Sequence, residues 1–295
     1  MKPFEYSEPT TIAEATQLLS SQRGKARILA GGVDLLPRMR AGTIDGDYII
    51  NIMRIPDLDY LEYDGSNGLA FGAMTKLRSL ETSEALRSSY PSLYSAIRQI
   101  TSIQVKCMGT AVGNLCVATP ASDVATVLYS LGARVKIAGT NGDRSEPIEA
   151  FYPDAHRASL RQGEMVTGVF VPSPASGTQA VFLNLVRTHA DIAKVSVAVA
   201  VTVEDGICRE AKIAIGAVAP TVIRASVAEE ELRGKELTSQ VIEAAAMTTS
   251  GETRTISDVR STAEYRKNMA DVLVRRALEK VVQRASDGSA KEERL

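Results

Sequence analysis

Two short segments of this 295-residue chain set glycine beside small and polar residues, a combination that suits a bulky ligand bearing phosphate. The first segment runs over residues 30–35 and the second over residues 109–114, with Asp123 a little further along the chain. Glycine accepts positive φ and has no Cβ to hold a phosphate away from the backbone. The pair of segments therefore predicts a bound nucleotide cofactor.

The first segment has the composition of a turn between a strand and a helix. An apolar stretch over residues 26–29 precedes it, and residues 35–40 are typical of a short helix. The N–H groups and the dipole at a helix start favour an anion such as pyrophosphate, and Asp34 is the expected N-cap of this helix. An ordinary strand-to-helix turn has the same composition, so this segment alone leaves both interpretations open.

The second segment carries hydrogen-bonding side chains within an otherwise apolar region. Thr110 and Asn114 can donate or accept hydrogen bonds with phosphate or ribitol oxygens, and Asp123 can accept from hydroxyl groups. Residues 120–123 also read as the start of a helix over residues 124–131, with Ser122 or Asp123 as its cap. The two interpretations are compatible with each other.

Both segments resemble motifs of one family, the FAD-binding medium subunits of the molybdenum hydroxylases, which include xanthine dehydrogenase and carbon monoxide dehydrogenase. Residues 30–36, Ala-Gly-Gly-Val-Asp-Leu-Leu, resemble the family's Ala-Gly-Gly-Thr-Asp-Leu-Leu, and residues 105–123 resemble its second flavin motif. The resemblance spans most of the chain. Departures from it are Val33, Lys106, Cys107 and Val112. Because Val112 replaces a glycine, we expect Gly113 to take any unusual dihedral there, and flavin affinity could be reduced.

The resemblance implies that the chain is the flavoprotein subunit of a molybdenum-dependent dehydrogenase or hydroxylase. FAD, whose ring system performs the electron transfer, would receive electrons from iron–sulfur clusters on another chain and pass them to an external acceptor. The implied partners are a large subunit with the molybdenum cofactor and a small subunit with two 2Fe-2S clusters, in a dimer of heterotrimers. The implied cofactor-binding residues are Ala30, Gly31, Gly32, Val33, Asp34 and Leu35 at the pyrophosphate, Thr110, Gly113, Asn114 and Asp123 at the phosphate and ribitol, and Asp191, Ile192 and Lys194 beside the flavin ring.

Several alternatives stay open at this point. The chain could be a stand-alone FAD oxidoreductase, or a non-enzymatic partner-binding scaffold that has lost its flavin. Lys194 could face solvent instead of the ring, and His189 is a further candidate contact in the same segment. The sequence contains no convincing Ser-His-Asp set or metal-ligand cluster, so we expect neither catalytic side chains nor a metal site.

Composition excludes other classes of function. Lys and Arg total 34 against 35 acidic residues without a basic block, which argues against nucleic-acid binding. No apolar run approaches the roughly 20 residues that span a bilayer, and no signal-peptide core is visible, so a cytoplasmic location is expected. Three cysteines are fewer than the four or so thiolates that hold an iron–sulfur cluster, and Cys107 and Cys116 are expected to be small, partly buried residues.

The pattern of apolar residues predicts an α+β fold in two domains. A two-part FAD-binding domain over residues 1–172 comprises a small βαβ unit over about 1–56 and a larger α+β unit over 57–172. A C-terminal domain over 178–285 is an antiparallel sheet with helices on one face, and a flexible polar tail covers 286–295. Helices are expected over 11–22, 77–87, 92–100, 124–131, 225–232, 239–250 and 261–284, and strands over 27–30, 48–52, 69–71, 133–137, 180–186, 195–203 and 207–218.

Overall fold

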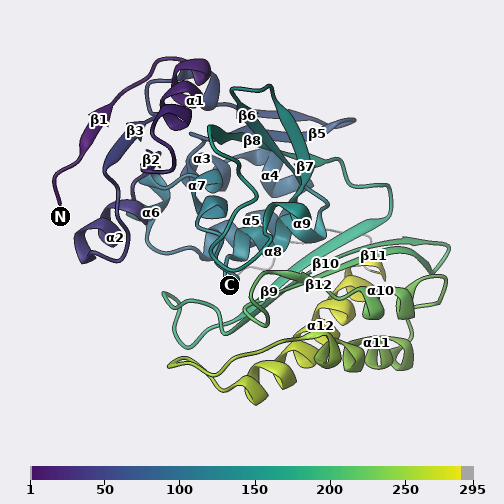
Figure 1. Ribbon diagram of the computed structural model, residues 1–295. Helices are drawn as coiled ribbons and strands as arrows, with labels where there is room; N and C mark the ends of the chain where they lie inside the picture. Colours follow the sequence, from purple (N-terminus) through teal and green to yellow (C-terminus); the bar gives the residue numbers. More distant parts are fainter. Residues whose placement is uncertain (1, 287–295) are drawn as a thin grey trace. The chain divides into compact units, whose positions relative to one another are not determined.

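A computed structural model describes residues 2–286 and confirms the expected α+β class (Figure 1). The chain forms two compact units that interleave in sequence. The first comprises residues Met1–Glu84, Ile100–Ala118 and Gly132–Ser173, and the second comprises Ala85–Gln99, Thr119–Leu131 and Pro174–Leu295. Beyond Ser286, the expected tail lies outside the described residues.

The first unit begins with a small parallel sheet that contains the strands expected on either side of the first glycine segment. Its strands follow the order β1-β3-β2, with β1 at Glu5–Ser7, β2 at Ala26–Leu29 and β3 at Tyr48–Asn51. Helix α1 (Ile12–Ser21) leads into β2 and is capped by Thr11, whose Oγ1 accepts a hydrogen bond from the backbone N–H of Glu14. The first glycine segment follows β2 and leads into α2 (Leu35–Ala41), as expected.

A five-stranded antiparallel sheet forms the rest of the first unit. Its strand order is β4-β5-β8-β6-β7, so β8 (Glu164–Pro172), which the sequence pattern did not predict, is central. The expected helix over 77–87 is wrong in its length, since α3 ends at Glu81 and α4 starts at Glu84. The other elements of this unit are β4 (Leu61–Asp64), β5 (Gly68–Gly72), β6 (Arg134–Gly139), β7 (Arg144–Pro147), η1 (Pro56–Leu58), α3 (Leu77–Glu81), α6 (Ile103–Met108), α7 (Ala111–Cys116) and α9 (Ile148–Phe151). Helix α4 (Glu84–Ser89) belongs to the second unit except for its first residue.

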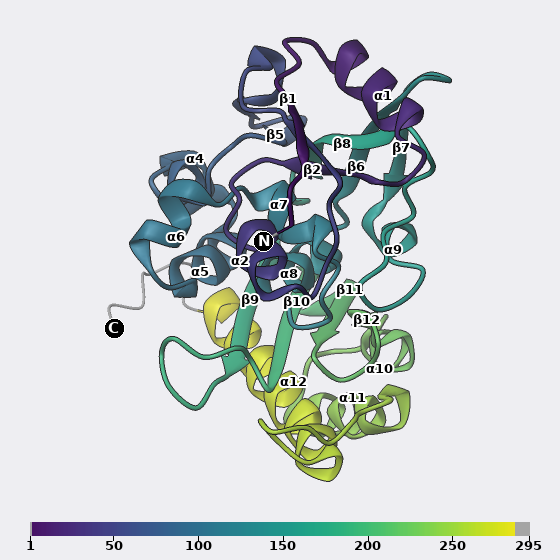
Figure 2. The same ribbon diagram turned by 60° about the vertical axis from the view of Figure 1, so that its left-hand side comes forward.

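The second unit is built on a four-stranded antiparallel sheet in the order β12-β11-β10-β9. As predicted, β10 and β11 form a hairpin whose turn contains Asp205 and Gly206. In Figure 2 the long helix α12 runs beneath this sheet. The elements are β9 (Thr178–Leu185), β10 (Val195–Glu204), β11 (Ile207–Gly216), β12 (Ile223–Arg224), α5 (Pro91–Gln99), α8 (Asp123–Ser130), α10 (Ser226–Leu232), α11 (Ser239–Glu252) and α12 (Ala263–Ser286).

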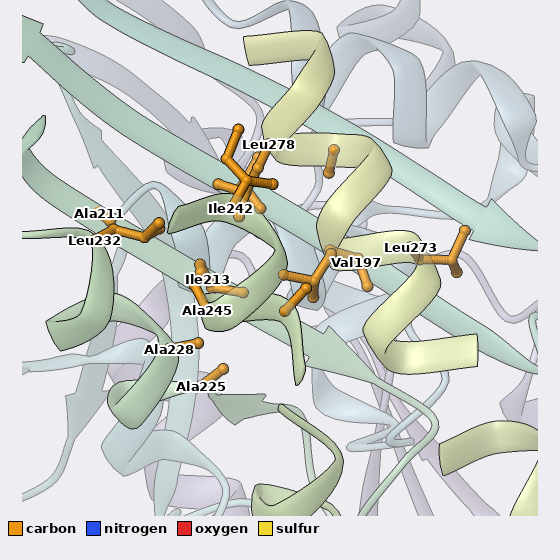
Figure 3. Packing of buried hydrophobic residues seen from close by; sticks show 14 of the residues in the cluster. Val197, Ala211, Ile213, Ala225, Ala228, Leu232, Ile242, Ala245, Leu273 and Leu278 are labelled. Atoms are coloured by element: carbon orange, nitrogen blue, oxygen red, sulfur yellow. The ribbon is translucent and has the colours of Figure 1, made fainter. Parts of the chain in front are cut away.

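Strand β10 is buried on both sides because helices cover both faces of its sheet. The C-terminal helices cover one face, as expected, and α5 and α8, which come from earlier in the chain, cover the other (Figure 1). Figure 3 shows the packed core on the first face, whose labelled members are Val197, Ala211, Ile213, Ala225, Ala228, Leu232, Ile242, Ala245, Leu273 and Leu278. On the second face the residues of β10 are small, namely Ser196, Ala198 and Ala200. Small residues let α8 approach the sheet closely.

The buried stripe of α12 is shifted from the one the sequence suggests. The apolar periodicity predicts a stripe of Tyr265, Met269, Val272, Leu273 and Val281. Tyr265 is 43% exposed, however, whereas Arg266 is buried in line with Ala270, Leu273 and Val274. The sequence pattern favours Tyr265 over Arg266 as the buried residue, because a charged residue is rarely buried without a partner. The partners of Arg266 are described below.

Several remaining features of the described residues bear on function. Within residues 2–286, no helix combines the length and apolarity needed to cross a membrane, and no cluster of three or more His, Cys, Asp and Glu residues could hold a metal ion. Cys208 is buried, but Cys107 and Cys116 are exposed, so the expectation that these two are partly buried is wrong.

Candidate functional site

The two glycine segments meet in the first unit. A Cβ on Gly31 would lie 2.3 Å from the carbonyl oxygen of Met108 and 2.7 Å from the Cα of Gly109, distances that real Cβ atoms do not show. On Gly109, a Cβ would lie 3.6 Å from Cγ2 of Val33. Residues about 75 positions apart in the sequence therefore form one continuous backbone surface, and only glycine at position 31 allows it.

The residues before α3 hold the second segment from its other side. The backbone N–H of Leu77 donates to the oxygen of Gly109 at 3.0 Å, and the N–H of Ala111 donates to the oxygen of Thr75 at 3.3 Å. Lys76 Nζ donates to the oxygen of Met108 at 3.1 Å. Burial lowers the pKa of this lysine, and the charge of Asp59 opposes the effect. Backbone pairing on both sides thus fixes the position of the segment.

The second segment is the start of a helix as well as a loop. Thr110 caps α7, since its Oγ1 accepts a hydrogen bond from the N–H of Gly113 at 2.9 Å. Gly113 and Asn114 lie inside the helix, and Gly113 is not among the residues with positive φ. The expectation of an unusual dihedral at Gly113 is therefore wrong. Val112 is 3% exposed within the same helix, where valine needs no unusual backbone.

The first segment is a turn between a strand and a helix, as expected, but the side chain at its N-cap position makes no capping hydrogen bond. Gly32 takes a left-handed φ of 71°, the conformation for which glycine is suited. Asp34 stands at the N-cap position of α2, but its side chain makes no capping hydrogen bond. Its carboxylate instead accepts from Arg38 Nη1 at 3.2 Å. Asp34 thus occupies the predicted N-cap position, but its side chain supplies no acceptor to the N–H groups of this turn.

A buried ion pair beside the second segment was missed by the sequence reasoning. Lys106, on α6, places its Nζ 2.5 Å from Oε1 of Glu81 on α3, and these side chains are only 8% and 11% exposed. Arg78 contacts the other oxygen of Glu81 at 2.6 Å. Burial raises the pKa of the Glu81 carboxyl, but the hydrogen bonds from Lys106 and Arg78 outweigh burial and hold the pKa below its ordinary value. The signal that could have found the pair is a lysine inside the apolar run Ile-Gln-Val-Lys-Cys-Met.

Asp123 lies in the second unit, at the start of α8. The predicted helix cap is confirmed for Ser122, whose Oγ accepts from the N–H of Ala125 at 3.0 Å. Oδ2 of Asp123 accepts from Asn184 Nδ2 at 3.0 Å, whereas Oδ1 is buried and has no hydrogen-bond partner among the described residues. Burial raises the pKa of Asp123 to about 6, opposed by hydrogen bonds from Asn184 and Ser196. A buried carboxylate oxygen without a donor is costly, so this atom is suited to a hydroxyl of a ligand.

The third expected group lies on the connection between β9 and β10. Asp191 accepts from Arg187 Nε at 3.3 Å, Ile192 is 49% exposed, and His189 is exposed. Lys194 Nζ lies 6.0 Å from the ring centroid of Tyr265, within the range of a cation–π contact. Strand β10 begins at the next residue, Val195, and its second residue is Ser196.

These features fit a flavin dinucleotide in two respects. At the junction of the glycine segments, the backbone of Gly31 lies directly against the backbone of Met108 and Gly109 with no side chain between them. The orphaned Oδ1 of Asp123 needs a donor, and the ribitol chain of FAD is rich in hydroxyl groups. Backbone groups around Gly31 and Gly109 are therefore the candidate cofactor contacts of the first unit, and the Asp123 carboxylate is a separate candidate contact of the second unit.

Comparison with known proteins shows matches along nearly the whole chain. Residues 2–174 match the family described as the FAD binding domain in molybdopterin dehydrogenase, and residues 180–281 match the CO dehydrogenase flavoprotein C-terminal domain. The carbon monoxide dehydrogenase medium chain of Afipia carboxidovorans is 31% identical over 96% of this chain and 98% of its own length. The glyceraldehyde dehydrogenase medium chain of Sulfolobus acidocaldarius is 31% identical over 94% of this chain and 98% of its own.

A solved structure shows the same fold. The matched chain of carbon monoxide dehydrogenase from Hydrogenophaga pseudoflava superposes with a TM-score of 0.92 at 32% identity, covering 96% of this chain and 99% of that one.

Proposed function

Because this chain belongs to the FAD-binding subunits of the molybdopterin dehydrogenases, we propose that it passes electrons from iron–sulfur clusters on a partner chain, through its FAD, to an external acceptor. The family and the cofactor expected from the sequence, FAD, are confirmed by the matches, as is the role of flavoprotein subunit of a molybdenum-dependent enzyme. Bound FAD supplies the redox chemistry, and the protein binds and orients it.

The meeting of Gly31 with the second glycine segment is the observation that carries this proposal. It supports a cofactor site in which residues 30–35, Thr110, Gly113 and Asn114 contact phosphate and ribitol oxygens mainly through the backbone. Thr110 contributes its hydroxyl hydrogen, because its oxygen already accepts from Gly113. Asp123 accepts from a ribitol hydroxyl through Oδ1, and Asp191, Ile192 and Lys194 border the flavin ring.

The proposed partners follow from what the chain contains. Relatives are named as medium chains, which supports large and small companions. Three cysteines are too few for two iron–sulfur clusters, so we assign the 2Fe-2S clusters to a small subunit and the molybdenum cofactor to a large one, in a dimer of heterotrimers. Relatives of equal identity are named for carbon monoxide and for glyceraldehyde, two unlike substrates, which supports substrate selection outside this chain.

The scaffold alternative is disfavoured by the position of Val112. A valine in place of glycine would damage the site if that residue needed a left-handed backbone, but Val112 occupies an ordinary buried helical position. The stand-alone oxidoreductase would need its own substrate site, and the features described above are accounted for by cofactor binding.

Purification of the chain from its native source with its companions tests the proposal. The expected sample contains FAD together with about one molybdenum and about four iron atoms per flavin, as two 2Fe-2S clusters require. Substrate should reduce the flavin in the assembled complex but not in the separated subunit. A separated subunit that oxidises an organic substrate by itself would favour the stand-alone enzyme, and a colourless chain that cannot be reconstituted with FAD would favour the scaffold.

A further inference from the structure

Arg266, near the start of α12, is a buried cation that bonds three separate segments. Its side chain is 5% exposed, and its Nη2 lies 2.7 Å from Oδ1 of Asp258. Its Nη1 donates to the backbone oxygen of Lys194 at 2.9 Å and to that of Ala217 at 3.0 Å. A planar guanidinium can reach several acceptors in fixed directions, which a lysine ammonium on its flexible stem cannot do.

Asp258 is held in its ionised form and is the counter-ion of Arg266. Burial raises its pKa, but hydrogen bonds from the backbone of Arg260, from the Arg266 guanidinium and from the backbone of Ser261 lower the pKa to about 2. The carboxylate therefore stays ionised and pairs with Nη2 of Arg266, while Nη1 holds the two carbonyl groups.

The two residues that carry these carbonyl groups, Ala217 and Lys194, lie in segments that contact the chain on either side of Asp123 in sequence. Ala217 holds Pro120 through a hydrogen bond from its N–H to the oxygen of Pro120 at 2.8 Å, three residues before Asp123. Lys194 lies two residues before Ser196, whose Oγ is 3.2 Å from Oγ1 of Thr126, three residues after Asp123 in α8. Arg266 thus fixes the backbone on two sides of the carboxylate without touching it.

The backbone that Arg266 holds has little freedom to shift. A Cβ on Gly216 would lie 2.4 Å from Oγ of Ser196, 2.5 Å from Oγ1 of Thr126 and 3.1 Å from the oxygen of Pro120. The next residue, Ala217, has a left-handed φ of 62°, which non-glycine residues rarely adopt. Hydrogen bonds at both its N–H and its C=O keep Ala217 in this conformation, and the second of these comes from Arg266.

We propose that Arg266 is a positioning residue for flavin binding, which holds Ala217 and Lys194 so that the free oxygen of Asp123 is correctly placed for the cofactor. The inference rests on the proposed contact between Asp123 and FAD. It gives Arg266 a role beyond attaching α12 to the sheet. That simpler role is filled further along the same helix by Arg284, whose Nη1 donates to the oxygen of Ala180 at 3.0 Å.

The test compares Arg266→Lys and Arg266→Met with the matched control Arg284→Met in the assembled complex. The measurements are the dissociation constant of FAD, the midpoint potential of the bound flavin and the melting temperature. We expect the Arg266 variants to weaken FAD binding about tenfold, within the range that coupling between neighbouring residues spans, and to shift the potential. Arg284→Met should lower the melting temperature and leave both flavin properties unchanged. Arg266→Lys keeps the charge and serves if Arg266→Met fails to assemble.

A double-mutant cycle with Asp123→Asn separates this inference from the proposed function. If Arg266 acts through Asp123, Arg266→Lys should weaken FAD binding much less in the Asp123→Asn background than in the wild type. Equal losses in both backgrounds, or a lower melting temperature with unchanged flavin properties, would overturn the positioning role. If Asp123→Asn itself leaves FAD affinity unchanged, the proposed contact of Asp123 is the part that fails.

Discussion

Replacing Asp123 by asparagine should change how the stability of the flavin-free protein depends on pH. Burial raises the pKa of this carboxyl from 3.8 to about 6, against the opposing hydrogen bonds from Asn184 and Ser196. A carboxyl with a raised pKa binds its proton more tightly in the folded state than in the unfolded state. The wild-type protein therefore loses stability as the pH rises from about 4 to about 6, and the loss is complete above that range.

The size of this effect follows from the same pKa values. A tenfold change in proton affinity is worth about 1.4 kcal/mol, so the ionised Asp123 destabilises the folded protein by about 3 kcal/mol at neutral pH. Asparagine has the same shape and does not titrate. The free energy of unfolding of Asp123→Asn, relative to the wild type, should therefore rise by about 3 kcal/mol between about pH 4 and about pH 7.

Urea denaturation at a series of pH values measures this difference. The chain has no tryptophan, so far-ultraviolet circular dichroism is the suitable signal. Asp205→Asn, in the exposed turn between β10 and β11, is the matched control for the change from aspartate to asparagine. If the difference for Asp123→Asn stays within about 1 kcal/mol over this range, the carboxyl is not desolvated and the reasoning about its free oxygen is refuted.

Four further substitutions test local packing, a buried ion pair and a helix cap. Gly31→Ala should weaken FAD binding at least about tenfold, because its Cβ would meet a backbone oxygen at 2.3 Å. Gly251→Ala, a helical glycine with open space around it, should instead stabilise the protein by about 0.5–1 kcal/mol in thermal unfolding. Lys106→Met should cost about 3 kcal/mol by leaving Glu81 buried with a weaker counter-charge, and a second change, Glu81→Leu, should recover most of that loss in urea denaturation. Ser122→Ala should cost about 1 kcal/mol through the lost helix cap, and an unchanged melting temperature would contradict this.

Elements with a strong local pattern could be predicted from the sequence. The hairpin of β10 and β11 has β-branched runs on both sides of an Asp-Gly turn, and the structure contains it in the expected place. Strand β8 was missed although it is central in its sheet. Its partners β5 and β6 come from residues 68–72 and 134–139, and a short apolar run carries no local signal of such distant pairing.

The sequence indicates candidate site residues but not the contacts that support them. The family motifs indicate both glycine segments and Asp123, but the sequence pattern predicts no helix over residues 111–116, where α7 forms. A threonine followed by Ala-Val-Gly-Asn is a weak helix signal. In the structure the hydroxyl of Thr110 caps the first turn, and the helix begins at the next residue. Lys106 and Arg266 were missed because pattern reading assigns charged residues to the surface, and only the fold shows the partners that let them be buried.

The structure also changes the reason for the glycines. The sequence suggested that glycine lets a phosphate approach the backbone, but the Cβ direction of Gly31 is filled by the second segment, and that of Gly216 by Ser196 and Thr126. In both places glycine lets the protein pack against itself, and the cofactor must approach from other directions. Alanine at either position should therefore destabilise the flavin-free protein as well as weaken FAD binding. If these glycines served only to let the ligand approach the backbone, alanine would leave the melting temperature of the flavin-free protein unchanged. That melting temperature therefore distinguishes the two explanations.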